Sequence, residues 1–270
     1  MSDLRPFFGF YGGKWRTAPH YPYPRHSIIV EPFAGSAGYS VRYADHEVWL
    51  FDVDPYIAGV WRYLISASPD EMMGLPDLQP GQSVDDLKVP QEARWLIGFW
   101  INFAPASPRK RFSAGATRNR QYWSQFKGSP RPLVWGPRVR ERLARQVTKI
   151  RHWKIFEADY RTAQNPPATW FIDPPYQGAA GKHYRHLIDD YPSLGYWCRK
   201  RFGQVIVCEG AGATWLPFQP FGAHKSNPQR SSRAYSQEVI WVEPWSASYP
   251  IGAQEDDWKP RETGGGDERK

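Results

Sequence analysis

A series of short apolar runs, each ending in polar or turn-forming residues, constrains the fold most. The runs occupy 27–30, 48–51, 153–156, 170–172, 205–207 and 238–242. Consecutive apolar residues are typical of strands covered on both faces, as in parallel sheets of α/β folds. Helix candidates lie between several of them, for example at 37–44 and 57–66. This alternation predicts an α/β sheet with crossover helices.

Residues 67–150 interrupt the alternation. They begin with a segment rich in Pro, Gly and Asp and continue with an apolar helix candidate at 92–104. The remainder is strongly basic and ends with a second helix candidate at 137–151. We therefore predict a mainly helical insertion at 67–150 between the second and third strands of a discontinuous domain formed by 1–66 and 151–250. A tail at 251–270, ending in Gly-Gly-Gly-Asp-Glu-Arg-Lys, is expected to be disordered.

Composition limits the class of protein. Hydrophobic residues make up 41% of the chain, which is enough to build a core, and the formal net charge of +8 comes with 14 Trp. Basic, aromatic-rich chains suit nucleic acid, because cations meet phosphates and flat rings stack on bases, although composition alone leaves other partners open. Cys198 and Cys208 are too few for a disulfide framework or a metal cage, and both are expected to be buried thiols.

The amino-terminal sequence indicates where the protein works. It has no basic segment followed by a long apolar stretch, so no secretory signal is expected. No run reaches the roughly 20 apolar residues of a membrane helix. We expect a soluble, intracellular protein without a membrane partner.

Residues 31–38, Glu-Pro-Phe-Ala-Gly-Ser-Ala-Gly, connect the first strand to a helix. Small residues there let backbone N–H groups approach a ligand at the carboxyl edge of the sheet. No Gly-Lys-Ser/Thr follows, so the loop is not a phosphate-binding Walker loop. An ordinary tight turn is the alternative. The predicted ligand contacts are Glu31, Phe33, Ala34, Gly35, Ser36, Ala37 and Gly38.

Asp52 ends the second strand, roughly 20 residues beyond that loop. An acid at this position can accept hydrogen bonds from ribose hydroxyls, or it can cap the following helix. The loop and Asp52 together predict a cofactor that contains a nucleoside. Because no phosphate cradle is present, S-adenosylmethionine is favoured over a dinucleotide.

The stretch Asp173-Pro174-Pro175-Tyr176 follows the strand predicted at 170–172. Proline restrains itself and the residue before it, so this loop is stiff and can aim hydrogen-bond acceptors. We expect the Asp173 carboxylate and the Pro174 carbonyl to accept both N–H bonds of an exocyclic amine, which would direct the nitrogen lone pair at a methyl group on a sulfonium. Tyr176 would offer a face for a flipped base.

This chemistry requires no metal. His183 and His186 lack a third ligand at suitable spacing, so no metal site is predicted. The segment 181–184 is instead expected to belong to a mobile loop that closes over the base.

Three motifs in this order resemble the adenine-N6 DNA methyltransferases of the Dam type, α-group: Phe-Phe-Gly-Phe-Tyr-Gly-Gly-Lys at 7–14, the loop at 31–38, and Asp-Pro-Pro-Tyr at 173–176. The resemblance covers roughly residues 5–245. It implies a Rossmann-like S-adenosylmethionine-dependent methyltransferase sheet, with the insertion as target recognition domain. It also implies double-stranded DNA as partner and a bacterial or phage-encoded protein acting in the cytoplasm.

Individual roles follow from the same resemblance. Asp173 falls on the catalytic acid, and Asp159, with Tyr160 beside it, falls where the family's carboxylate meets the amino group of the cofactor's adenine. Phe10 and Lys14 fall where an aromatic and a lysine contact the cofactor. The family has Trp-Ala where this chain has Phe10-Tyr11, so the role of this aromatic pair is less defined.

The insertion departs further from the family, so the recognition sequence is open. Its predicted DNA contacts are Arg109, Lys110, Arg111, Arg118 and Arg120, with a solvated basic loop as the alternative. Cytosine N4, or an amine of RNA or protein, would be an alternative acceptor. A catalytically dead DNA-binding module on the same fold is a further alternative. Oligomeric state is not indicated.

Overall fold

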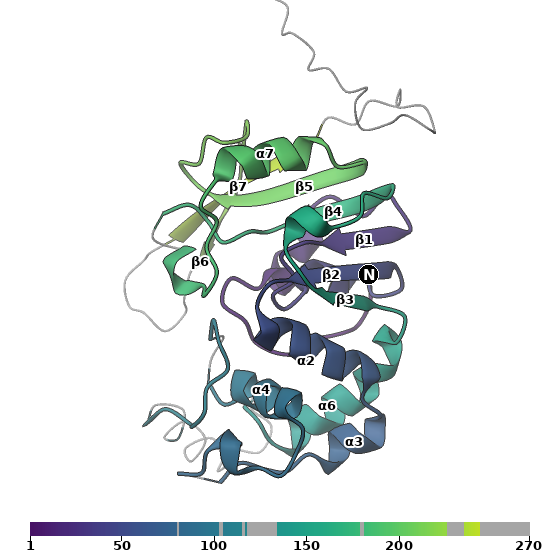
Figure 1. Cartoon of the computed structure of the whole chain (residues 1–270), viewed down its shortest axis with the longest axis vertical. Coiled ribbons are helices and arrows are strands. Elements are labelled where there is room, and N and C mark those ends of the chain that lie inside the picture. The colour runs from purple at the N-terminus through teal and green to yellow at the C-terminus, as the bar shows by residue number, and fades with distance from the viewer. Residues whose placement is uncertain are drawn as a thin grey trace, which may run out of the picture.

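The computed structural model describes residues 1–79, 81–102, 105–114, 117, 134–178, 181–225 and 235–243, without the side chains of 222–225, 235 and 236. Its centre is a seven-stranded sheet of order β3-β2-β1-β4-β5-β7-β6 (Figure 1). The strands are β1 (Ile28–Glu31), β2 (Glu47–Asp52), β3 (Lys154–Glu157), β4 (Ala168–Ile172), β5 (Gly203–Gly210), β6 (Gln219–Lys225) and β7 (Tyr235–Val242).

The sheet is mostly parallel. β3, β2, β1, β4 and β5 run parallel to one another, whereas β7 is antiparallel to both β5 and β6. The chain builds outward from β1 to β3 on one side and from β4 to β5 on the other, so strand order reverses between β1 and β4. This arrangement is Rossmann-like, and in such sheets the crevice at the reversal is where ligands bind.

Besides short 3-10 turns, six α-helices with both ends in the described residues accompany the sheet. They are α1 (Gly38–Arg42), α2 (Pro55–Ser66), α3 (Pro69–Gly74), α4 (Gln91–Trp100), α6 (Pro137–Val147) and α7 (Tyr191–Arg199). Three begin with an acceptor side chain at the cap and a proline in the first turn: Asp54 caps α2, Ser68 caps α3 and Asp190 caps α7. Such starts satisfy free N–H groups and supply a backbone angle already suited to the helix.

All six apolar runs form strands, as predicted. Alternate residues of one run pack into two different clusters: Ile29 lies on one face and Val30 on the other, and Phe171 opposes Trp170 in the same way. Both faces are therefore covered, which explains why the runs carry no polar alternation. The sequence did not indicate β6, an outer strand that contains proline and glycine and pairs on one side only.

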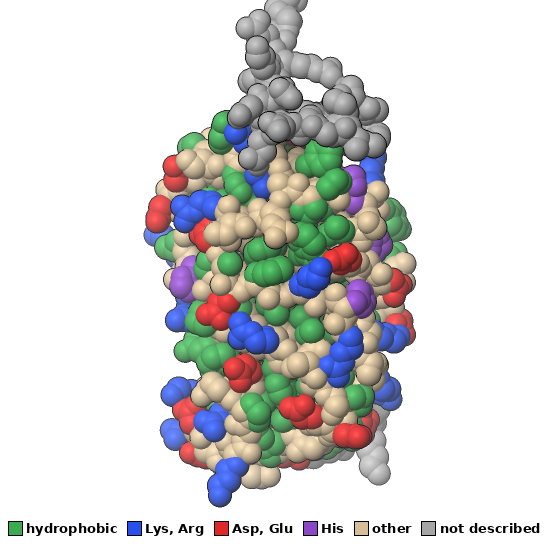
Figure 2. Space-filling view, turned by 45° about the vertical axis from the view of Figure 1, so that its right-hand side comes forward, with side chains coloured by type: hydrophobic (Ala, Val, Ile, Leu, Met, Phe, Trp, Pro, Cys, Tyr) green, Lys and Arg blue, Asp and Glu red, His purple; other side chains and the backbone are tan. Residues whose placement is uncertain are grey.

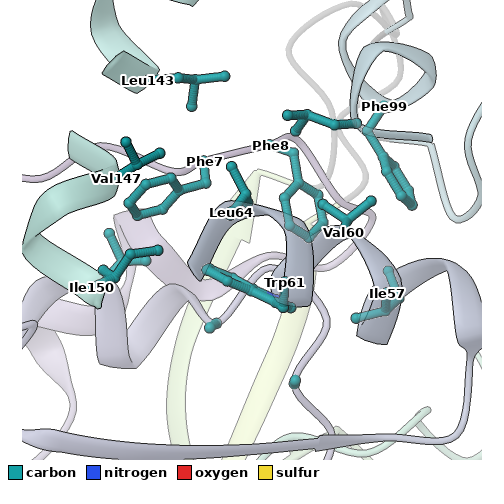
Figure 3. Packing of buried hydrophobic residues seen from close by; sticks show 14 of the residues in the cluster. Phe7, Phe8, Ile57, Val60, Trp61, Leu64, Phe99, Leu143, Val147 and Ile150 are labelled. Carbon is teal, nitrogen blue, oxygen red and sulfur yellow. The ribbon is translucent and has the colours of Figure 1, made fainter. Parts of the chain in front are cut away.

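The predicted helices of the insertion are present at α4 and α6. In Figure 1, α2 lies between the sheet and the group α3, α4 and α6. These helices share a hydrophobic cluster with the sheet: Leu143 and Val147 of α6 and Phe99 of α4 surround Phe7 and Phe8 near Trp61 of α2 (Figure 3). The described part of residues 67–150 therefore continues the core of the main domain. The predicted boundary of a separate recognition domain stays a prediction.

The amino-terminal segment is fixed within this core. Phe8 contacts Phe99 with ring centroids 4.9 Å apart, and the indole of Trp100 donates to the Phe7 carbonyl at 2.8 Å. Cys198 and Cys208 are buried free thiols, as expected. In the described part of the chain, no helix is long and apolar enough to cross a membrane.

Gly38, the first residue of α1, allows the backbone of residues 14–15 to lie against that helix. A Cβ there would meet the backbone N of Trp15 at 2.4 Å and two backbone atoms of Lys14 at 2.8 Å. Backbone atoms cannot rotate aside as the end of a side chain can. Gly38 is therefore required for the close approach of residues 14–15 to the loop at 31–38.

We predict that Gly38→Ala destabilises the protein by about 1–3 kcal/mol, the usual range for overpacking. The check is the midpoint of urea unfolding, with Gly74→Ala as control. Gly74 ends α3, and a Cβ there would have nothing within 4 Å, so this variant should be as stable as the wild type or slightly more stable. Equal effects of the two substitutions would contradict the argument from packing.

Candidate active site

A pocket of about 910 Å³, including its open mouth, lies at the carboxyl ends of β1, β2 and β4. Its walls contain every predicted cofactor contact: Phe10, Tyr11, Lys14, Glu31, Phe33, Ala34, Gly35, Ser36, Ala37, Gly38, Asp52, Asp159, Tyr160 and Asp173. Residues that came from five separate stretches of sequence are thus brought to one cavity. Its position matches the crevice expected where strand order reverses.

The loop at 31–38 is tightly held. Gly35 and Ala37 both have left-handed backbone angles, with φ of +45° and +46°. The Gly35 N–H donates to Asp52 Oδ2 at 3.0 Å, and its carbonyl accepts the Trp61 indole N–H at 2.8 Å. A non-glycine residue such as Ala37 costs roughly 1–2 kcal/mol in this conformation. Strain of that kind persists where surrounding contacts fix the backbone.

Asp52 does two things at once. Besides the Gly35 bond, its Oδ1 accepts the Asp54 N–H at 2.9 Å, and its side chain lines the pocket. Burial raises the pKa of Asp52 to about 7, against the effect of these two backbone donors. The carboxylate therefore fixes the loop and remains sensitive to a ligand that favours its charged form.

Glu31 ends β1 and is buried. It accepts the Ser40 N–H at 2.7 Å, which ties the strand end to α1. Burial raises the pKa of Glu31 to about 8. This carboxylate lines the pocket too, so a cationic ligand would lower the pKa of both Glu31 and Asp52.

Asp159 also lines the pocket, and both of its carboxylate oxygens accept hydrogen bonds. Arg161 Nε donates to Oδ1 at 2.7 Å and Arg161 Nη2 to Oδ2 at 2.9 Å. These hydrogen bonds keep the pKa of Asp159 below its ordinary value. The arginine is mostly exposed. A ligand amino group would have to share this carboxylate with Arg161.

Asp173 meets Lys14 at the inner end of the pocket. Lys14 Nζ lies 2.8 Å from Asp173 Oδ1, and the two side chains are only 9% and 18% exposed. Burial raises the pKa of Asp173 while the lysine opposes the rise. Burial also lowers the pKa of Lys14, but the carboxylates of Asp173 and Glu238 outweigh it and hold the pKa above its ordinary value. Lys14, predicted as a cofactor contact, is thus also the ionic partner of the predicted catalytic acid.

The rest of the Asp-Pro-Pro-Tyr stretch is held from outside the pocket. The Tyr191 hydroxyl donates to the Pro175 carbonyl at 2.8 Å, and the N–H of Gln177 donates to Glu209 at 3.2 Å. Glu209 is fully buried on β5. Pro175 lines the cavity with Asp173, whereas Pro174 and Tyr176 do not.

Tyr176 has a defined place beside Lys14. The ammonium lies 4.8 Å from the centre of its ring, and its hydroxyl donates to Glu238 at 3.1 Å. One face of the ring is therefore covered by a cation. The predicted stacking of a base on Tyr176 stays a prediction, now confined to the other face.

The segment after the motif contributes to the wall of the pocket. Residues 184–188 line it, and Arg185 Nη1 lies 2.8 Å from Asp54 Oδ1. Tyr184 donates to the Tyr11 carbonyl at 3.3 Å, and a Cβ on Gly12 would lie 2.5 Å from the Tyr184 hydroxyl. Part of the loop predicted at 181–184 thus lies at the site, whereas its mobility and its closure over a base stay predictions. Its ion pair with the cap of α2 had no signal in the sequence.

Of the five basic residues predicted to contact DNA, Arg109, Lys110 and Arg111 are described and exposed. Lys110 forms an ion pair with Asp85 at 2.7 Å. Arg118 and Arg120 lie outside the described residues. On the face shown in Figure 2, basic and acidic side chains are interspersed, so that face carries no single basic field.

Acidic side chains outnumber basic ones in the lining of the pocket. Of the described lining residues, five are acidic, against the cations Lys14 and Arg185 and the histidine His186; the acids are Glu31, Asp52, Asp54, Asp159 and Asp173. The described residues contain no group of three or more His, Cys, Asp or Glu arranged to hold a metal.

Comparison with known proteins does not assign a family. No family model matches the chain, and no curated protein does. Among solved structures, a conserved hypothetical protein from Streptococcus pyogenes matches with a TM-score of 0.29 and 8% identity, over 86% of this chain and 94% of that one. The Rossmann-like assignment therefore rests on the strand order of the sheet itself.

Proposed function

We propose that this protein transfers a methyl group from S-adenosylmethionine to N6 of an adenine flipped out of double-stranded DNA. One observation carries the proposal: Asp173 lines the same pocket as Asp52 and the loop at 31–38. A carboxylate at the end of β4 is thereby next to a site suited to a nucleoside. The resemblance of the motifs at 7–14, 31–38 and 173–176 to Dam-type enzymes gives the acceptor and the donor.

The pocket suits this cofactor in the kind of residues that line it. S-adenosylmethionine supplies a methyl group on a cationic sulfonium, and the acidic lining would favour a cation. A dinucleotide would bring a pyrophosphate to the same carboxylates. The antiparallel β7 between β5 and β6 also departs from the dinucleotide-binding strand order.

Asp173, held by the prolines that follow it, is suited to activate the amine that receives the methyl group. The carboxylate would accept hydrogen bonds from the amine, which raises electron density on the nitrogen. A C–N bond would form as the S–C bond breaks, S-adenosylhomocysteine would leave as a neutral thioether, and the Asp173 carboxylate would take the proton that the amine loses. Two prolines and the bonds to Pro175 and Gln177 keep the acceptor in place, so little reorganisation is needed.

We predict that Asp173→Ala lowers the methyl-transfer rate at least tenfold and up to about a thousandfold, because polarisation of the amine is lost. Cofactor binding should remain measurable. Transfer of radiolabelled methyl to DNA of mixed sequence, with single-stranded DNA and RNA in parallel, checks both the rate and the acceptor. Asp189→Ala, in an exposed part of the following loop, is the control. More than about a tenth of the wild-type rate in Asp173→Ala would contradict the role.

We predict that ionisation of Asp52 makes cofactor affinity rise with pH up to about 7, and that this contribution is constant at higher pH. Asp52 must lose its proton to accept a ribose hydroxyl, and its pKa without ligand is about 7. Below that pH, affinity should fall by up to roughly tenfold per unit, with protons released on binding.

Calorimetry of S-adenosylmethionine binding in buffers of different ionisation heat measures this proton release. Asp52→Asn should bind more weakly and lose this part of the pH dependence. An affinity that rises as the pH falls, or a pH dependence unchanged in Asp52→Asn, would contradict the assignment of Asp52.

Charge reversal at Arg109 and Arg111 should weaken DNA binding and reduce the slope of log affinity against log salt by about 2, roughly one unit per lost phosphate contact. S-adenosylmethionine binding should be unchanged. Lys149→Glu is a control, since Lys149 is an exposed cation that pairs with Asp3. Equal loss of DNA and cofactor binding would indicate misfolding instead of lost phosphate contacts.

A further inference from the structure

β7 brings a carboxylate from late in the chain to the edge that carries Asp173. Glu238 pairs in register with Gly210, at the carboxyl end of β5. Because β7 is antiparallel, its first residues lie at the edge where the parallel strands finish. Glu238 is buried there, at 8% exposure.

Two hydroxyl groups and one ammonium group lie near the same oxygen of this carboxylate. Glu238 Oε1 accepts the Tyr176 hydroxyl at 3.1 Å and also accepts the Tyr21 hydroxyl. Lys14 Nζ lies 3.8 Å from the same atom and 2.8 Å from Asp173 Oδ1. The ammonium is therefore placed between two carboxylates, with the Tyr176 ring 4.8 Å away.

Sharing Lys14 changes what Asp173 can do. A buried ammonium with Asp173 as its only acidic neighbour would interact with that carboxylate more strongly and compete with the N–H groups of a substrate amine. Glu238 attracts the same ammonium from the other side. It also fixes the hydroxyl of Tyr176, three residues beyond Asp173, and so restrains the stretch that aims the acid.

We propose that Glu238 is a positioning residue for methyl transfer. It shares Lys14 with Asp173 and holds the hydroxyl of Tyr176, so that Asp173 can accept hydrogen bonds from the amine of the substrate. This inference rests on the proposed function. It assigns Glu238 no contact with cofactor or base, since it does not line the pocket.

The test compares Glu238→Gln, Glu238→Ala, Tyr176→Phe and the double variant Glu238→Ala/Tyr176→Phe with the wild type, in kcat on DNA and in Kd for S-adenosylmethionine. Glu238→Gln removes the charge but keeps an oxygen that accepts the Tyr176 hydroxyl; it should lower kcat about 10- to 100-fold with Kd within about threefold, because the loss falls on the acceptor side. Tyr176→Phe should cost less, and the double variant should lie within about twofold of Glu238→Ala, since both of its substitutions remove the same hydrogen bond. Glu243→Gln, directly after β7 and outside the pocket lining, is the matched control and should keep the wild-type kcat.

Three results would overturn the inference: a kcat for Glu238→Gln within about threefold of wild type, parallel losses in kcat and cofactor affinity, or effects of Glu238→Ala and Tyr176→Phe that multiply. Glu238→Asp retains the charge and should recover more activity than Glu238→Gln. Equal activity of these two variants would also count against a role for the charge.

The same proteins separate this inference from the proposed function. A wild type that transfers no methyl to DNA would overturn the proposed function and, with it, the catalytic role of Glu238. The contact itself is measured by urea unfolding. Destabilisation in the double variant should be smaller than the sum of the two single effects, and additive effects would show that Glu238 and Tyr176 do not interact.

Discussion

The ion pair between Lys14 and Asp173 connects the core of the protein to its candidate active site. A buried ammonium is costly unless carboxylates surround it, and removing one partner of a buried pair commonly costs about 3–5 kcal/mol. Lys14 reaches this position only because Phe7 and Phe8 are packed between α2 and the helices of the insertion, and because Gly38 admits the backbone at residues 14–15. Packing of the amino-terminal segment thus determines where the ammonium lies beside the acid.

Much of the sheet could be predicted because burial on both faces leaves a local signal. The run at 170–172 is apolar at every position since Trp170 and Phe171 pack on opposite faces. β6 has no such signal: Gln219–Lys225 contains a proline and a glycine, pairs on one side only, and needs no continuous apolar run. The continuity of the core with α4 and α6 was equally invisible, because helical periodicity shows that a face is buried but does not identify its partner.

The pocket lining could be anticipated for a similar reason. Carboxyl ends of parallel strands share an edge, so Glu31, Asp52 and Asp173 could be expected together once their strands were assigned. Glu238 could not, because it starts the apolar run at 238–242 and looks like a residue at the beginning of a strand. Its strand runs antiparallel, and the contact with Tyr176 spans 62 positions in sequence. Arg185 is a similar case, since its ion pair with Asp54 depends on how a loop folds back.

The distribution of charge gives the proposed function its physical coherence. The chain carries a net charge of +8, yet five acidic side chains line the pocket. A net positive charge favours phosphates at long range, whereas a cavity with several carboxylates favours a cation at close range. A dinucleotide enzyme would need the opposite sign inside. Under the proposal, the two signs serve two ligands: the polyanion outside and the sulfonium within. Lys14 lies between Asp173 and Glu238, so its positive charge is shared by two carboxylates. The other carboxylates of the pocket are then not paired with Lys14.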